Sequence, residues 1–115
     1  MSNWTSAQDG AWDNPSTWTN GIGYPAAAGD TVTVRHNVTY GTKLNVGDGF
    51  GDITIASNGV LIHQVEMDVD GVLLIDGGGC LHQKPGSKIY FSGTSGENHG
   101  IHFENEANAA HIAEG

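Results

Sequence analysis

Short runs in which hydrophobic and polar residues alternate, separated by glycine-containing turns, extend through most of the chain. Strict alternation is the pattern of a β-strand with one buried face, because successive side chains point to opposite sides of the strand. No segment shows a convincing helical period. The sequence therefore predicts an all-β protein, with strands at residues 30–34, 37–40, 43–46, 53–55, 60–63, 65–69, 72–75, 80–83, 88–91 and 101–103.

Several of these runs repeat with a fixed period of roughly 20 residues, a length typical of solenoid repeats. One period separates Gly51 from Gly71, and the same period separates Gly59 from Gly79. It also aligns Leu61 with Leu81 and Ile101, and aligns Ile53 and Ile55 with Leu73 and Ile75. In a solenoid each coil stacks on the one before, so like residues recur in register. We expect a short, single-stranded β-solenoid of three to four coils.

Residues 1–28 differ from the rest, because they contain no repeat and hold all three tryptophans, Trp4, Trp12 and Trp18. Unpaired strand edges at a solenoid end recruit other chains unless they are covered. We therefore interpret residues 1–28 as a Trp-rich N-terminal cap and residues 29–115 as the coils of one single domain.

Two strands carry apolar residues on both faces. Odd-numbered residues such as Leu61 and Leu73 can face one interior, yet the even-numbered Val60, Ile62, Val72 and Leu74 are also apolar. In so small a protein the second face has few internal partners, so a subunit contact through these four residues is the economical explanation. The alternative is a flattened, sandwich-like solenoid in which the cap or the tail covers them. We expect a homo-oligomer, with a trimer favoured.

The charge and composition exclude several classes of partner. The net charge is -9, and only Arg35, Lys43, Lys84 and Lys88 are basic. Four scattered cations cannot track nucleic-acid phosphates, and the acidity disfavours an anionic membrane surface. The polar start at Met1 predicts no signal peptide, and no apolar run is long enough for a transmembrane segment. Cys80 is the one cysteine in the sequence, so no internal disulfide can form. We interpret Cys80 as a small core residue.

Two segments near the N-terminus resemble a known module. The residues Trp12-Asp-Asn-Pro-Ser-Thr-Trp18, with Tyr24-Pro25, and the segment Ala28-Gly-Asp-Thr-Val-Thr-Val34 resemble the opening of G8-type β-solenoid modules. Ser57-Asn-Gly-Val-Leu61 and Val69-Asp-Gly-Val-Leu73 are similar to the glycine-led strands that follow it. Such modules occur in phage surface proteins and in secreted polysaccharide-active proteins. The resemblance implies a right-handed β-solenoid (a β-helix) and a non-catalytic role.

Histidines and aspartates supply weak candidates for a metal site. His82 and His102 are one period apart and would meet on neighbouring coils, where two imidazoles suit a transition metal. Asp48 and Asp52 flank one turn and could offer oxygen ligands to calcium. An outward histidine ladder needs no metal, however, and aspartates beside turn glycines commonly cap local amides. We therefore predict no metal and no cofactor.

The aromatic residues permit carbohydrate binding as an alternative function. Trp4, Trp12, Trp18, Tyr24 and Tyr40 are sufficient for a stacking platform. Packing inside the cap is favoured for Trp12 and Trp18, since they match cap positions of the resembled modules. No nucleophile-elbow motif or convincing carboxylate pair is present, so we predict no enzyme.

Together, these features favour a non-enzymatic structural protein of an assembly. A small, acidic domain with apolar residues on an outer face is suited to a surface layer. The most concrete expectation is a phage virion component at the virion surface, either a head-decoration protein or a fibre module. Its partners would be its own copies or other virion proteins. The alternative is a carbohydrate-binding module related to secreted polysaccharide-active proteins, with a glycan as its ligand.

Overall fold

The computed structural model describes residues 3–19, 23–42, 44, 49–85, 87–91, 100–103 and 110–113. Within them the chain is almost entirely β-structure, as the alternating pattern predicts, with one 3-10 turn, η1, at Pro15–Thr17. The strands are β1 (Asn3–Thr5), β2 (Gly10–Ala11), β3 (Thr31–Val34), β4 (Asn37–Tyr40), β5 (Ile53–Ile55), β6 (Val60–His63), β7 (Met67–Val69), β8 (Val72–Ile75), β9 (Cys80–Gln83), β10 (Ile89–Phe91), β11 (Gly100–Phe103) and β12 (Ala110–Ala113). No helix in these residues is long and apolar enough to span a membrane.

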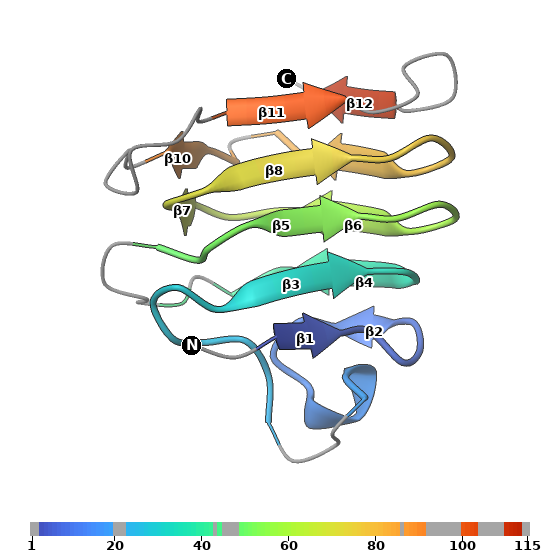
Figure 1. Cartoon of the computed structure of the whole chain (residues 1–115), viewed down its shortest axis with the longest axis vertical. Coiled ribbons are helices and arrows are strands. Elements are labelled where there is room, and N and C mark those ends of the chain that lie inside the picture. Colours follow the sequence, from blue (N-terminus) through green and yellow to red (C-terminus); the bar gives the residue numbers. More distant parts are fainter. Residues whose placement is uncertain are drawn as a thin grey trace.

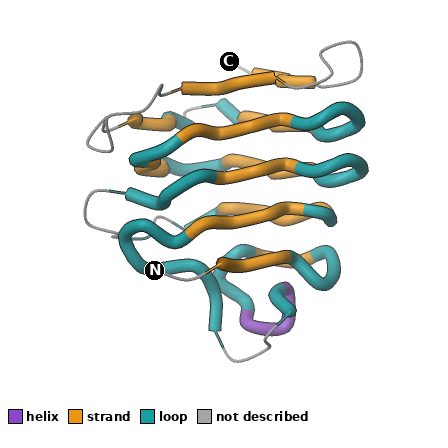
Figure 2. Tube along the Cα trace, in the orientation of Figure 1, coloured by secondary structure: helices purple, strands orange, loops and turns teal. Residues whose placement is uncertain are grey.

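The strands form two five-stranded parallel sheets and one two-stranded parallel sheet. The two larger sheets have the orders β1-β3-β5-β8-β11 and β12-β9-β6-β4-β2, and β10 pairs with β7 in the third. The chain moves from one large sheet to the other and back, so that each passage adds one strand to each sheet (Figure 1). Turns and loops join the strand ends at the sides of the stack (Figure 2).

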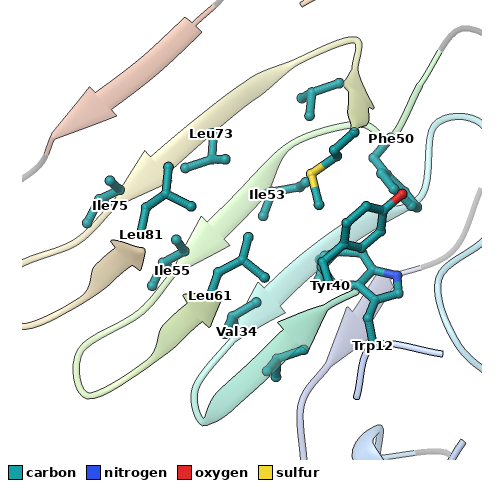
Figure 3. Close-up of a cluster of buried hydrophobic side chains, with 14 of the residues drawn as sticks. Trp12, Val34, Tyr40, Phe50, Ile53, Ile55, Leu61, Leu73, Ile75 and Leu81 are labelled. Atoms are coloured by element: carbon teal, nitrogen blue, oxygen red, sulfur yellow. The ribbon is translucent and has the colours of Figure 1, made fainter. Parts of the chain in front are cut away.

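The core lies between the two large sheets. Ile53 and Ile55 on β5, Leu73 and Ile75 on β8, and Leu61 on β6 are fully buried there (Figure 3). Ile53 pairs with Leu73, and Leu61 pairs with Leu81, each at the spacing of the sequence repeat. The ladder of like residues that the repeat predicts is therefore confirmed for β5, β6, β8 and β9.

The predicted alignment of Ile101 with Leu81 is wrong. Ile101 pairs with Leu73 in the other large sheet, and Leu81 pairs with His111. Ile101 comes more than one period after Leu73, because the chain between β9 and β11 is longer than elsewhere in the repeat and also supplies β10.

The repeating glycines mark places where one strand layer approaches the next too closely for a side chain. A Cβ atom on Gly79 would lie 2.7 Å from the carbonyl oxygen of Ile55, and one on Gly59 would overlap the carbonyl oxygen of Val34. Asn58 precedes Gly59 with a positive φ of 69°, which tightens the turn into β6. These contacts explain why glycine recurs with the period of the sequence repeat.

Residues 1–28 do more than cover one end of the stack. β1 pairs with β3 and β2 pairs with β4, so this segment supplies an end strand to each large sheet. Residues 29–115 contribute four strands to each large sheet, and residues 1–28 supply the fifth. The return segment after η1 then covers the edge of β1, where Thr19 donates a backbone hydrogen bond to Thr5 at 3.0 Å.

Candidate functional site

The four residues predicted to form one subunit contact lie on two different surfaces. Val60 and Ile62 belong to β6, whereas Val72 and Leu74 belong to β8, and these strands are in different large sheets. All four are half-buried and alternate with fully buried neighbours, so their side chains point away from the shared core. Because the sheets lie on opposite sides of that core (Figure 1), the predicted single contact is wrong. There are two apolar patches, facing in opposite directions.

Neither large sheet carries a charged residue in any of its strands. Their ten strands contain no Asp, Glu, Lys or Arg, although the chain has a net charge of -9. In the described part of the chain the charged residues lie in turns or on the third sheet, namely Asp9, Asp13, Asp30, Arg35, Asp52, Glu66, Asp68, Asp70, Asp76, Lys84 and Lys88. Charge therefore surrounds two uncharged sheet surfaces, a distribution typical of protein interfaces, whose centres are depleted in charge.

We define the β6 face as the outward surface of the sheet β12-β9-β6-β4-β2. Its middle strand is β6, so Val60 and Ile62 lie near its centre. Cys80 is in register with Val60, and His82 with Ile62, on the adjacent β9. Both β9 residues are half-buried, so Cys80 is not the core residue expected from the sequence. Burial raises the pKa of its thiol, which favours the neutral form.

We define the β5 face as the outward surface of the sheet β1-β3-β5-β8-β11. Thr5, Thr33 and Thr54 follow one another in register across its first three strands, and Leu74 continues the row on β8. The middle strand, β5, thus presents a threonine, and the apolar pair Val72 and Leu74 lies off centre. The two faces differ in where their apolar residues are placed.

The third, smaller sheet carries an exposed aromatic residue that the sequence reasoning missed. Tyr90 on β10 is 46% exposed and pairs with Asp68 on β7. Glu66 and Lys88 directly precede these two strands, so this side of the molecule is charged. The alternation in Lys88-Ile-Tyr-Phe91 could have placed Tyr90 outward, because Ile89 packs against the core.

Most of the aromatic residues considered for sugar stacking are inside the protein. Trp12, Trp18 and Tyr40 are at most 1% exposed, so no ring face is available to a glycan, and a platform that includes them is wrong. The ring centroids of Trp12 and Tyr40 are 5.0 Å apart, in an edge-on arrangement. Trp4 and Tyr24 are half-buried and pack against the same core.

Hydrogen bonds from their indole N–H groups fix the three tryptophans in place within the fold. Trp12 Nε1 donates to the carbonyl oxygen of Pro25 at 2.9 Å, and Trp18 Nε1 donates to that of Trp12 at 2.8 Å. Trp4 Nε1 donates to Oδ2 of the buried Asp30 at 3.2 Å. Each indole therefore has a partner within the protein, as burial requires.

The two histidines considered as metal ligands do not share a ladder. His82 pairs with Ile62 and Ile112 on the β6 face, whereas the backbone of His102 pairs with Leu74 in the other large sheet. The expectation that they meet on neighbouring coils is wrong, because it extended the repeat spacing beyond β9. The side chain of His102 is outside the described part of the chain.

The aspartates considered for calcium also have no metal-like arrangement in the described part of the chain. Asp52 is exposed and accepts a hydrogen bond from the backbone N–H of Val72 at 3.0 Å, so it caps a strand. Asp48 lies outside the described residues. Those residues contain no group of three or more His, Cys, Asp or Glu side chains that could hold a metal ion.

A serine and a histidine make contact, yet without access to a substrate. Ser6 Oγ lies 2.9 Å from His36 Nδ1 and accepts a hydrogen bond from the backbone N–H of Arg35 at 2.7 Å. Ser6 is only 2% exposed, and the described residues enclose no pocket. The pair therefore ties the end of β1 to the turn between β3 and β4.

His63 is a titratable group that is fully buried in the core. It is 0% exposed and lies on β6, in register between Tyr40 on β4 and Gln83 on β9. The Nε2 atom of His63 has no hydrogen-bond partner. Gln83 Nε2 lies 3.3 Å from its Nδ1. Desolvation lowers the pKa of His63 to about 4, against the opposing effect of the backbone of Val65. His63 is therefore neutral at physiological pH.

Comparison with protein-family models, with curated proteins and with solved structures gave no match. What the chain does must therefore be inferred from the two uncharged faces, the charged third sheet and the buried aromatic residues.

Proposed function

We propose that this protein is a non-enzymatic structural component of a protein assembly, which it joins through the uncharged outer faces of its two large sheets. The observation that carries the proposal is the absence of Asp, Glu, Lys and Arg from all ten strands of those sheets in a chain of net charge -9. Solvated faces of soluble proteins normally carry charge, whereas interface centres are depleted in it. The half-buried Val60, Ile62, Val72 and Leu74 supply the apolar contact area.

The scaffold in this proposal is a short right-handed β-solenoid. Support comes from the parallel register of successive strands and from the regular return of the chain to the same sheet. Crossovers between parallel strands of one sheet are right-handed in nearly all proteins, which supports the hand. Backbone hydrogen bonds in both sheets make such a body stiff. It can therefore hold partners on its two contact surfaces at a fixed distance and orientation.

The most concrete setting for such a component is the surface of a phage virion, as a head-decoration protein or a fibre module. The resemblance to β-solenoid modules of phage surface proteins supports this setting. An outward-facing layer also suits an acidic chain, since net charge opposes unwanted association. Carbohydrate binding receives less support, because Trp12, Trp18 and Tyr40 are buried and Tyr90 is an exposed ring without a second ring beside it in the described residues.

The proposal is tested by following the chain into particles. An affinity-tagged chain is expressed in the cells that encode it, and particles are separated from soluble protein on a density gradient. We expect the chain to sediment with the particles, and the double variant Ile62→Glu/Leu74→Glu to remain in the soluble fraction. Tyr90→Glu, which adds one glutamate to the third sheet and leaves both large faces unchanged, is the control and should sediment like the wild type. A wild-type chain found only in the soluble fraction would contradict the proposal.

A further inference from the structure

The β6 face and the β5 face differ in where their apolar residues lie relative to the middle strand, as well as in composition. On the β6 face the apolar pair Val60 and Ile62 lies on the middle strand of five, with Asn37 and Thr39 on one side and Cys80 and His82 on the other. On the β5 face the middle strand presents Thr54, and the apolar pair lies one strand away. An apolar centre with a more polar surround is the composition of an interface core and its rim.

We propose that the β6 face docks a second copy of this chain in a two-fold dimer; this inference rests on the proposed assembly function and names one partner for it. A two-fold contact brings the same patch of both copies together, so residues near the axis meet their own equivalents. A patch on the middle strand can meet its copy with the two faces fully overlapping. The off-centre pair Val72 and Leu74 would overlap its copy only with much of the β5 face left uncovered.

The charge distribution favours a copy of the chain as the occupant. Two bodies of charge -9 repel each other, and burying any of that charge between them would add a large desolvation cost. The β6 face buries none, because its strands contain no charged residue and the described acids nearest to them in sequence, Asp9, Asp13 and Glu66, lie outside the strands, beside β2 and after β6. The repulsion that remains acts between separated, solvated turns and is screened within about 10 Å at moderate salt. Two copies of the face can therefore meet without burying charge, with the apolar residues of one copy against those of the other.

The size of the face sets the strength of the contact. Five strands at about 4.8 Å spacing, each with about four residues at about 3.3 Å, cover roughly 300 Å² on each copy. A standard stable interface buries about 800 Å² on each partner. We therefore expect a weak dimer that forms in the micromolar to millimolar range. The β5 face remains free for another component, and because the two faces point in opposite directions this arrangement suits a two-fold dimer better than the trimer expected from the sequence.

Sedimentation velocity over protein concentrations from about 1 µM to about 1 mM tests the dimer. We expect the wild-type mass to rise from monomer to dimer across this range. Ile62→Glu should weaken dimerisation at least tenfold, because it places two like charges at the centre of the contact. Leu74→Glu is the matched control, since it makes the same kind of change at an equally half-buried residue of the opposite face, and it should dimerise like the wild type.

Circular dichroism and thermal unfolding establish that each variant is folded. If Ile62→Glu does not fold, Ile62→Thr replaces it, because threonine keeps the β-branched shape, removes apolar area and adds a hydroxyl without a charge; a weaker dimer is again expected. A wild type that stays monomeric throughout the range, or a Leu74→Glu variant that loses dimerisation as Ile62→Glu does, would overturn the inference. A monomer that still sediments with particles would overturn the two-fold dimer and leave the assembly function standing.

Discussion

The carboxylate of Asp52 accepts a hydrogen bond at 3.0 Å from the backbone N–H of Val72, one period later in the chain. Gly71, just before Val72, leaves room for this contact, since a Cβ atom there would overlap Oδ1 of Asp52. Residues one repeat period apart in the sequence thus meet between adjacent strands of the same sheet.

We expect Asp52→Ala to destabilise the fold by about 1 kcal/mol, because the N–H of Val72 loses its acceptor. Asp52→Asn keeps a side-chain oxygen at the same place and should lose less than half of that amount. Urea unfolding followed by circular dichroism measures both values. Equal losses in the two variants would show that charge, and not the hydrogen bond, is what matters there.

Gly59→Ala should destabilise the protein by roughly 2 kcal/mol or more, because the new methyl group would overlap the carbonyl oxygen of Val34. The neighbouring Asn58→Gly is the matched control, since Asn58 already has a positive φ of 69° that glycine adopts freely. That variant should stay within about 0.5 kcal/mol of the wild type. Thermal unfolding of both variants provides the comparison, and a tolerated Gly59→Ala would show that the layers are further apart than described.

Stability should decrease in acid because of His63. Its pKa is about 4 in the folded protein and 6.5 as the ordinary value, so between these two pH values the unfolded chain binds more protons. The contribution of neutral His63 is therefore complete above about pH 6.5 and is lost as the pH falls through about 4, up to about 3 kcal/mol in all.

The variant His63→Phe removes this titration and keeps an aromatic ring in the core. Its free energy of unfolding, measured from about pH 7 to about pH 4.5, should decrease less than that of the wild type. Replacing a ring whose Nε2 has no partner should also leave stability at neutral pH unchanged or raised. Parallel pH profiles of the two proteins would mean that His63 is accessible to water.

Trp12→Ala should destabilise the protein by about 3–5 kcal/mol, because Trp12 is 1% exposed and lies against Trp18, Tyr40 and Phe50. Tyr90→Ala, which removes a 46% exposed ring, should cost less than about 1 kcal/mol. Chemical unfolding followed by circular dichroism compares them. Similar losses would contradict the division into buried and exposed aromatic residues described above.

The sequence predicts the fold well where alternation and the glycine repeat alone determine which way a side chain points and which strand it pairs with. Alternation placed Leu61, Leu73 and Leu81 in one core, and the glycine repeat predicted the register of β5 with β8 and of β6 with β9. The repeat gave the wrong partner for Ile101, because the chain between β9 and β11 is longer than the matching connection between β6 and β8. No local signal in the residues reveals how such extra chain is accommodated.

The candidate site was harder to predict, because alternation shows that a residue points outward but not from which sheet. Val60, Ile62, Val72 and Leu74 share the same parity, yet the segment between β6 and β8, which includes β7, carries the chain to the opposite side of the core. The absence of charge from the ten strands becomes meaningful only when those strands are grouped into two surfaces. Which residues share a face is decided by strand membership, and residue type alone does not reveal it.

The central claim, that this chain is a structural component of an assembly, is tested most directly by counting its copies in purified particles. Particles from cells that encode the chain are purified without any tag, and the chain is quantified by mass spectrometry against isotope-labelled peptides. We predict a fixed ratio of this chain to the main shell or tail protein that persists through repeated gradient purification. A ratio that falls towards zero with each round would contradict the claim.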